Sequence, residues 1–112
     1  MTRDEARAML KNCNSRPAKL LAFSYVSLTE KELLVMQLRY IHGLTQEETI
    51  SRLPYCYAQL LNIPLEEAIE KYTPCLNSAQ NWERQALNKC ADIWRDTGFL
   101  EQLQRTIKQI PS

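Results

Sequence analysis

Glycine is scarce in this sequence, and it contains no long apolar run. The two glycines, Gly43 and Gly98, are too few for a fold rich in β-turns, whereas strong helix formers dominate the composition. No apolar stretch approaches the ~20 residues that a membrane helix needs. The charged first ten residues, MTRDEARAML, lack the apolar centre of a signal peptide. We therefore expect an all-α protein that stays in the cytoplasm and makes no membrane contact.

Paired cysteines are also lacking. The four cysteines are widely spaced, none forms a C-x-x-C motif, and the single histidine, His42, is not at ligand spacing from any of them. Thiols that fill the core of a protein in a reducing compartment explain this pattern better than a zinc site. No glycine-rich phosphate loop or catalytic set is present, because Glu47-Glu48 and Glu66-Glu67 follow helix starts, where acids stabilise the helix dipole. We predict no metal, no cofactor and no enzymatic activity.

Prolines and the two glycines divide the chain into helix-length pieces, and 112 residues suit one domain. We predict N-terminal helices within 1–26, helices at 30–42 and 46–53, an insertion at 54–76 with a short helix of its own, and helices at 77–96 and 98–110. Thr29 with Glu32, and Thr45 with Glu48, each form the T-x-x-E pattern of a capping box. These two patterns place a tight turn, His42-Gly43-Leu44, between the helices predicted at 30–42 and 46–53. Pro54 is expected to end the second of these helices.

The predicted helix 77–96 has two different faces. Apolar side chains recur on one of them at steps of three and four residues, which indicates burial: Ala79, Trp82, Ala86, Leu87, Cys90, Ile93 and Trp94. Amides and one arginine occupy the other face. Asn and Gln can make paired hydrogen bonds to adenine in the major groove of DNA, and Arg can do so to guanine. We therefore expect base contacts from Asn77, Ser78, Gln80, Asn81, Arg84 and Gln85, and backbone contacts from Asn88, Lys89 and Arg95.

Two stretches of the chain resemble a known DNA-binding family. Residues 27–53, SLTEKELLVMQLRYIHGLTQEETISRL, resemble the start of the promoter-binding region four of bacterial sigma factors, and also phage transcriptional regulators of the ArpU type. In these proteins a helix that begins L-T-x-x-E and ends R-Y-x-x-G-L-T precedes a helix that begins Q-E-E. Residues 77–94, NSAQNWERQALNKCADIW, resemble the recognition helix of the same family.

The resemblance implies a function and a further pair of contacts. It implies a helix-turn-helix in which helix 46–53 is the scaffold, so that Thr45 and Gln46 at its start contact the DNA backbone. The chain departs from the family at Thr49, where an aliphatic residue is usual, and at 54–76, which replaces a turn of a few residues. The implied protein is a regulator of transcription, of phage or mobile-element type, with a helix-turn-helix split by a helical insertion.

The charge distribution leaves a second function open. The net charge is +1; residues 1–29 carry five basic against two acidic side chains, residues 30–70 three against seven, and residues 71–112 six against four. Basic ends favour DNA, whereas near-neutrality and the acidic middle favour a module that binds RNA polymerase or another protein without DNA contact. An apolar stripe of Leu100, Leu103, Ile107 and Ile110 either closes the core or forms a homodimer through the C-terminal helix.

Overall fold

Residues 1–109 are described by the computed structural model, which contains seven α-helices and no β-strand in that part of the chain. The predicted all-α, multi-helix fold is confirmed. No helix among these residues is long and apolar enough to cross a membrane. In chain order the helices are α1 (Arg3–Asn12), α2 (Arg16–Ser24), α3 (Glu30–Tyr40), α4 (Gln46–Leu61), α5 (Leu65–Tyr72), α6 (Leu76–Ile93) and α7 (Phe99–Gln109).

Both predicted capping boxes are present. The Thr29 hydroxyl accepts a hydrogen bond from the Glu32 backbone N–H, and the Glu32 carboxylate accepts one from the Thr29 N–H. Thr45 and Glu48 do the same at the start of α4. Each such cap stabilises a helix by about 1 kcal/mol. Between α3 and α4, Gly43 has a φ of +70°, which residues with a Cβ seldom adopt, so the tight turn depends on glycine at this position.

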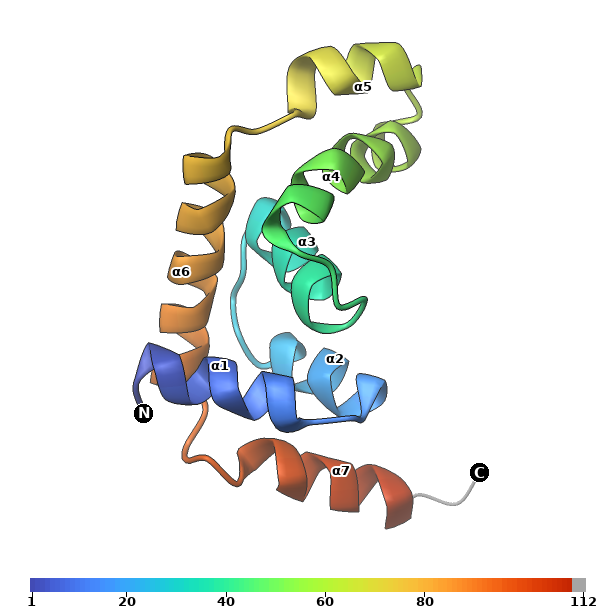
Figure 1. The fold of residues 1–112 in the computed structure, drawn as a ribbon. Helices are drawn as coiled ribbons and strands as arrows, with labels where there is room; N and C mark the ends of the chain where they lie inside the picture. The colour runs from blue at the N-terminus through green and yellow to red at the C-terminus, as the bar shows by residue number, and fades with distance from the viewer. Residues whose placement is uncertain (110–112) are drawn as a thin grey trace.

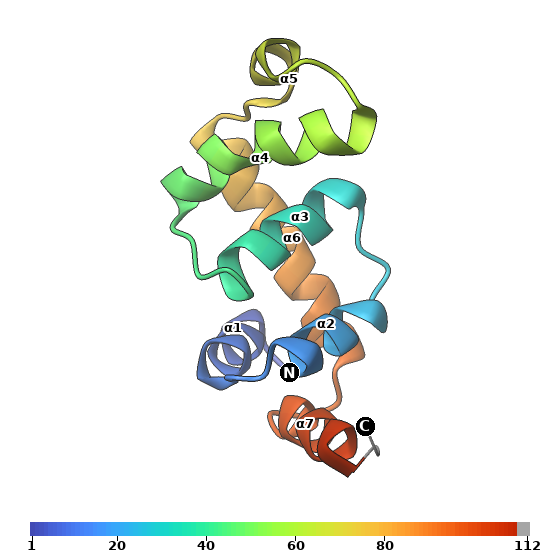
Figure 2. The same cartoon turned by 90° about the vertical axis from the view of Figure 1, so that its right-hand side faces the viewer.

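Helix α6 lies along one side of the molecule (Figure 1). It packs against α1, α3 and α4, while α7 packs on α2 and α5 packs on α4 (Figure 1). Figure 2 shows α4 and α5 at one end of the molecule, α2 and α7 at the other, and α6 running between the two ends. One side of α6 carries no neighbouring helix, and this free side is visible at the left of Figure 1.

Two apolar clusters hold α6 in place along its length. The larger one joins α1, α2, α3, α6 and α7 and includes Leu87 and Trp94, which are 0% and 1% exposed. The indole N–H of Trp94 donates a hydrogen bond to the Ala22 carbonyl over 3.1 Å. The smaller cluster forms where α3 meets α4, and Trp82 packs against it from α6. The first half of α6 is therefore anchored by one cluster and the second half by the other.

The prediction that Pro54 ends its helix is wrong, because α4 continues to Leu61. Proline cannot donate the backbone hydrogen bond that its position in a helix requires, and this loss is destabilising. The ring of Pro54 is buried, however, and its neighbours Leu53 and Tyr57 both belong to the smaller apolar cluster. We infer that this packing offsets the lost hydrogen bond and carries the helix through the proline.

The predicted insertion 54–76 is therefore built from different secondary-structure elements than expected. It consists of the second half of α4 followed by α5, whose Tyr72 ring stacks on Tyr57 with 4.5 Å between the ring centroids. The predicted short helix after Pro64 is present as α5. These residues lengthen α4 and add α5 on one side of it.

The boundaries of α6 also differ from the prediction. The predicted helix 77–96 is observed at Leu76–Ile93, with Cys75 as its N-cap. At Trp94 the backbone becomes extended, with ψ of 134°, which lets the indole reach the Ala22 carbonyl. Ile93, the last residue of α6, was predicted to be buried but is 53% exposed.

The apolar stripe of the C-terminal helix closes the core of the chain. Leu100 and Leu103 are buried and Ile107 packs against the larger cluster, whereas Ile110 lies outside the described residues. This outcome matches the first of the two roles that the sequence left open for the stripe.

Two of the four cysteines follow the core-thiol prediction. Cys13 and Cys90 are buried and Cys56 is half-buried, but Cys75 is exposed at the start of α6, so the prediction is wrong for that residue.

Two leucine substitutions test this distribution of buried and exposed side chains. Leu87→Ala removes fully buried methyl groups from the larger apolar cluster, and we expect it to lower the free energy of unfolding by about 2–5 kcal/mol. Leu60→Ala changes the same residue type at a position that is 60% exposed, so its effect should stay within about 0.5 kcal/mol. Urea unfolding followed by circular dichroism measures both; equal effects would contradict the described core.

Candidate nucleic-acid interface

The two faces of α6 are separated as the sequence predicts, with one exception. Ala79, Ala86, Leu87 and Cys90 are fully buried. Trp82 is half-buried between the smaller cluster and the ammonium group of Lys31, which lies 5.1 Å from its ring centroid. The exception is Ile93, described above. The inner face of α6 is therefore fixed against the rest of the molecule over most of its length.

The outer face carries the residues predicted to contact bases. Asn77, Gln80, Asn81, Arg84 and Gln85 are exposed, and Ser78 is half-buried. Neither the 54–76 segment nor the C-terminal helix covers them. A shallow, open hollow of about 400 Å³ is lined by Asn77, Ser78, Gln80, Asn81 and Arg84. The fold thus gathers most of the predicted base-contacting side chains on one accessible surface, which we call the α6 outer face.

The residues predicted to contact the DNA backbone have more varied surroundings. Asn88 and Arg95 are exposed. Thr45 is exposed and caps α4, where its hydroxyl accepts a hydrogen bond from the Glu48 N–H over 3.2 Å. Gln46 and Lys89 are instead held by buried carboxylates: the Gln46 side-chain amide donates to Glu83 over 3.2 Å, and the half-exposed Lys89 places its ammonium 2.6 Å from Glu32.

Glu83 is a structurally important residue that the sequence prediction omits. It is 4% exposed, and its carboxylate lies 2.6 Å from Nε of Arg39 and 3.8 Å from Nη2 of Arg7. Arg39 also donates to the Leu44 carbonyl over 2.7 Å. These contacts link α6 to α1, to α3 and to the turn before α4. The spacing could have revealed it, since Glu83 falls four residues after Ala79 and four before Leu87, on the apolar stripe.

Glu32 forms a second buried ion pair with α6. It is 2% exposed and serves both the α3 capping box and Lys89. Burial alone would raise the pKa of this carboxyl, but hydrogen bonds from Lys89 and Thr29 outweigh burial and lower its pKa below the ordinary glutamate value. Because Lys89 neutralises a buried carboxylate, its charge is not free for a phosphate group. Among the described residues of α6, Arg84 is the exposed basic side chain that forms no ion pair.

The start of α6 carries an exposed thiol beside this surface. Cys75 Sγ lies 3.2 Å from the Ser78 hydroxyl, and this hydrogen bond, with backbone N–H groups of the first turn, lowers the pKa of the thiol. Clusters of three or more His, Cys, Asp or Glu side chains suited to a metal ion are absent from residues 1–109.

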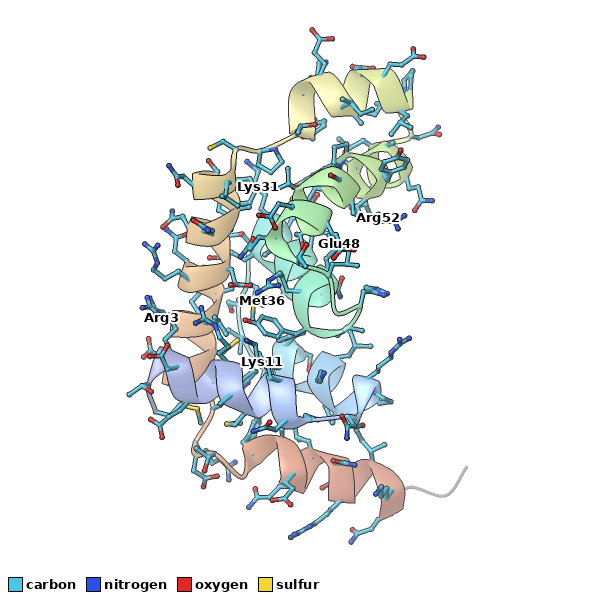
Figure 3. All side chains as sticks on the ribbon, in the orientation of Figure 1. Arg3, Lys11, Lys31, Met36, Glu48 and Arg52 are labelled. Carbon is cyan, nitrogen blue, oxygen red and sulfur yellow. The ribbon has the colours of Figure 1, made fainter. Side chains whose placement is uncertain are left out.

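Figure 3 places two arginines from other helices relative to α6. Arg3 of α1 lies beside the lower part of α6, on the side turned away from α4, and Arg52 of α4 lies on the opposite side of the molecule. Arg3 is therefore positioned to add positive charge near the α6 outer face, whereas Arg52 is not. Comparison with family models, curated proteins and solved structures finds no match to this chain.

The Glu32–Lys89 pair predicts a pH dependence of stability. Because the pKa of Glu32 is lowered in the folded protein, its contribution is fully present above the pKa of the unfolded chain and is lost as the pH falls through the folded value. Glu32→Gln should therefore flatten the loss of stability between about pH 7 and pH 3, which spans the ordinary glutamate range. Urea unfolding at a series of pH values measures it.

Glu48→Gln is the matched control for this experiment. Glu48 has the same capping-box hydrogen bonds, but it is exposed and has no lysine partner. Its removal should change the pH profile less than Glu32→Gln does. Superimposable profiles for the two variants would show that the ion pair with Lys89 contributes nothing.

Proposed function

We propose that this protein binds double-stranded DNA through the α6 outer face and regulates transcription. The observation that carries the proposal is the division of α6 into an anchored inner face and an accessible outer face of amides and one arginine. A helix held rigidly by its inner side can enter the major groove without losing contact with its own core. The regulatory role, of phage or mobile-element type, rests on the resemblance of 27–53 and 77–94 to sigma-factor region four and ArpU-type regulators.

The chemistry of the outer face suits direct contact with base edges. Asn81 and Gln80 can each accept and donate in the paired geometry that selects adenine, and Arg84 can donate twice to guanine. With 18 residues at about 1.5 Å per residue, α6 is long enough to follow several base pairs. In this proposal Asn77 and Ser78, at the start of the helix, contact bases or adjacent phosphates.

In this proposal the phosphate contacts are made by basic side chains of α1 and of the residues that follow α6. Arg3 lies on the same side as the outer face, and Arg95 is exposed just after the helix ends. Thr45 and Asn88 can contribute neutral hydrogen bonds. Lys89 and Gln46 are assigned no DNA contact, because both are held by buried carboxylates. Few cations remain, so the electrostatic part of binding is expected to be small.

The same scarcity of exposed cations favours a second candidate function. A module that binds a protein, such as RNA polymerase, needs no phosphate contacts and would use the same helical scaffold. The observation behind this alternative is that Arg84 is the unpaired basic side chain among the described residues of α6, since Lys89 is paired with Glu32. The two candidates differ in whether the chain binds duplex DNA at low salt.

Arg84→Ala tests the assigned DNA surface. A preferred duplex is first selected from a random pool, and fluorescence anisotropy then measures its affinity. Arg84→Ala should weaken binding by about 1–3 kcal/mol and relax the preference at one base pair. Arg52→Ala is the matched control, because Arg52 is exposed but lies on the opposite side of the molecule. Unchanged affinity in Arg84→Ala, or an equal loss in Arg52→Ala, would refute the assigned face.

The salt dependence of binding separates DNA from protein as the partner. Each phosphate contact should contribute a slope of about −0.9 in a plot of log affinity against log salt concentration. We expect Arg3→Ala to weaken binding similarly for all sequences and to reduce the slope by about one. If no selected duplex binds even at low salt, the protein-binding alternative replaces the proposal.

A further inference from the structure

Large apolar side chains are exposed at two opposite ends of the molecule, away from the α6 outer face. At one end, which we call the α4–α5 end, Leu60, Leu61 and Ile69 are 60%, 46% and 46% exposed. At the other, which we call the α2 end, Leu20 and Tyr25 are 45% and 56% exposed. Figure 2 shows the helices that carry these two groups at opposite ends of α6. Tyr25 packs edge-on against Phe99, with 5.8 Å between the ring centroids, but more than half of it stays exposed.

The two ends differ in shape. Leu60 and Leu61 lie in the last turn of α4, beyond the part that packs on α3. Both side chains protrude into solvent there. The α2 end is hollowed instead. One hollow of about 230 Å³ is lined mainly by apolar residues of α2, α3 and the loop between them: Leu20, Phe23, Ser24, Val26, Leu28, Leu33 and Gln37. This volume is below the ~300–1,000 Å³ of small-molecule sites, and it suits a single aliphatic side chain from a protein.

The two ends also differ in charge. Glu66 and Glu70 of α5 are exposed at the α4–α5 end, while Glu67 pairs with Lys71 over 2.7 Å. Helix α2 carries no acidic residue; its Arg16 is exposed, and its Lys19 is half-buried and donates one hydrogen bond to the Tyr40 carbonyl. Two α4–α5 ends would bring like charges together, which is destabilising, whereas an α4–α5 end facing an α2 end brings opposite charges together.

We propose that a second copy of this chain docks its α4–α5 end on the α2 end of the first. Leu60 of α4 enters the apolar hollow beside α2, and the acidic side chains of α5 face the basic side chains of α2. Such a contact is heterologous, because it joins two different surfaces, and it extends head to tail from copy to copy. Each apolar surface is small, so the association belongs to the weak, transient class of interfaces.

Sedimentation velocity on the full chain, without nucleic acid, tests this proposal. The weight-average mass should rise with protein concentration, and the rise should shrink between about 50 mM and 300 mM salt as screening increases. Leu60→Lys alters the α4–α5 end, and Leu20→Glu alters the α2 end. Both positions are exposed, so each variant should fold, which circular dichroism checks. Each substitution should weaken self-association about tenfold or more.

Sedimentation of a mixture of the two variants tests whether the contact joins two different surfaces. Leu60→Lys keeps an intact α2 end and Leu20→Glu keeps an intact α4–α5 end, so the mixture should form a 1:1 dimer that does not grow further. Gln59→Ser, an exposed polar change beside Leu60, is the matched control and should associate like the unaltered chain. A chain that stays monomeric at all concentrations, or variants that fail to combine when mixed, would overturn the proposal. Since no DNA is present, either outcome leaves the DNA-binding proposal to its own tests.

Discussion

The ion pair between Arg39 and Glu83 determines which side of α6 faces outward. A carboxylate that is 4% exposed requires a partner, because an unpaired buried charge costs several kcal/mol. Successive residues of an α-helix are separated by about 100° around its axis. A turn of α6 by one residue would therefore withdraw Glu83 from Arg39 and bring Trp82 or Arg84 towards it. The accessibility of the α6 outer face follows from this constraint as much as from the apolar clusters.

The starts of α3 and α4 were the most predictable part of the fold. Thr29 with Glu32 and Thr45 with Glu48 satisfy local backbone donors by themselves, so the T-x-x-E pattern is sufficient to predict them. The outer face of α6 was predictable for a related reason, since the period of 3.6 residues assigns Gln80, Asn81 and Arg84 to the side opposite the apolar stripe. Both inferences need only residues that are close in sequence.

The residues that could not be predicted depend on partners far away in the chain. Pro54 normally ends a helix, and only the packing of Leu53 and Tyr57 shows why α4 continues past it. Lys89 was expected to be free for phosphate, but its partner Glu32 lies 57 residues earlier. Trp94 leaves the helix because its indole finds the Ala22 carbonyl, 72 residues away. No local pattern contains these partners.

The use of basic side chains inside the fold changes what the net charge implies. Arg39 and Lys89 neutralise buried carboxylates, and Lys19 donates to the Tyr40 carbonyl over 2.7 Å. A count of basic residues along the sequence therefore overstates the positive charge available at the surface. If the α6 outer face binds a duplex, hydrogen bonds from its amides and Arg84 must supply more of the affinity than attraction to phosphates does. A protein of this kind would discriminate between sequences while binding unrelated DNA weakly, because unspecific affinity is mainly electrostatic.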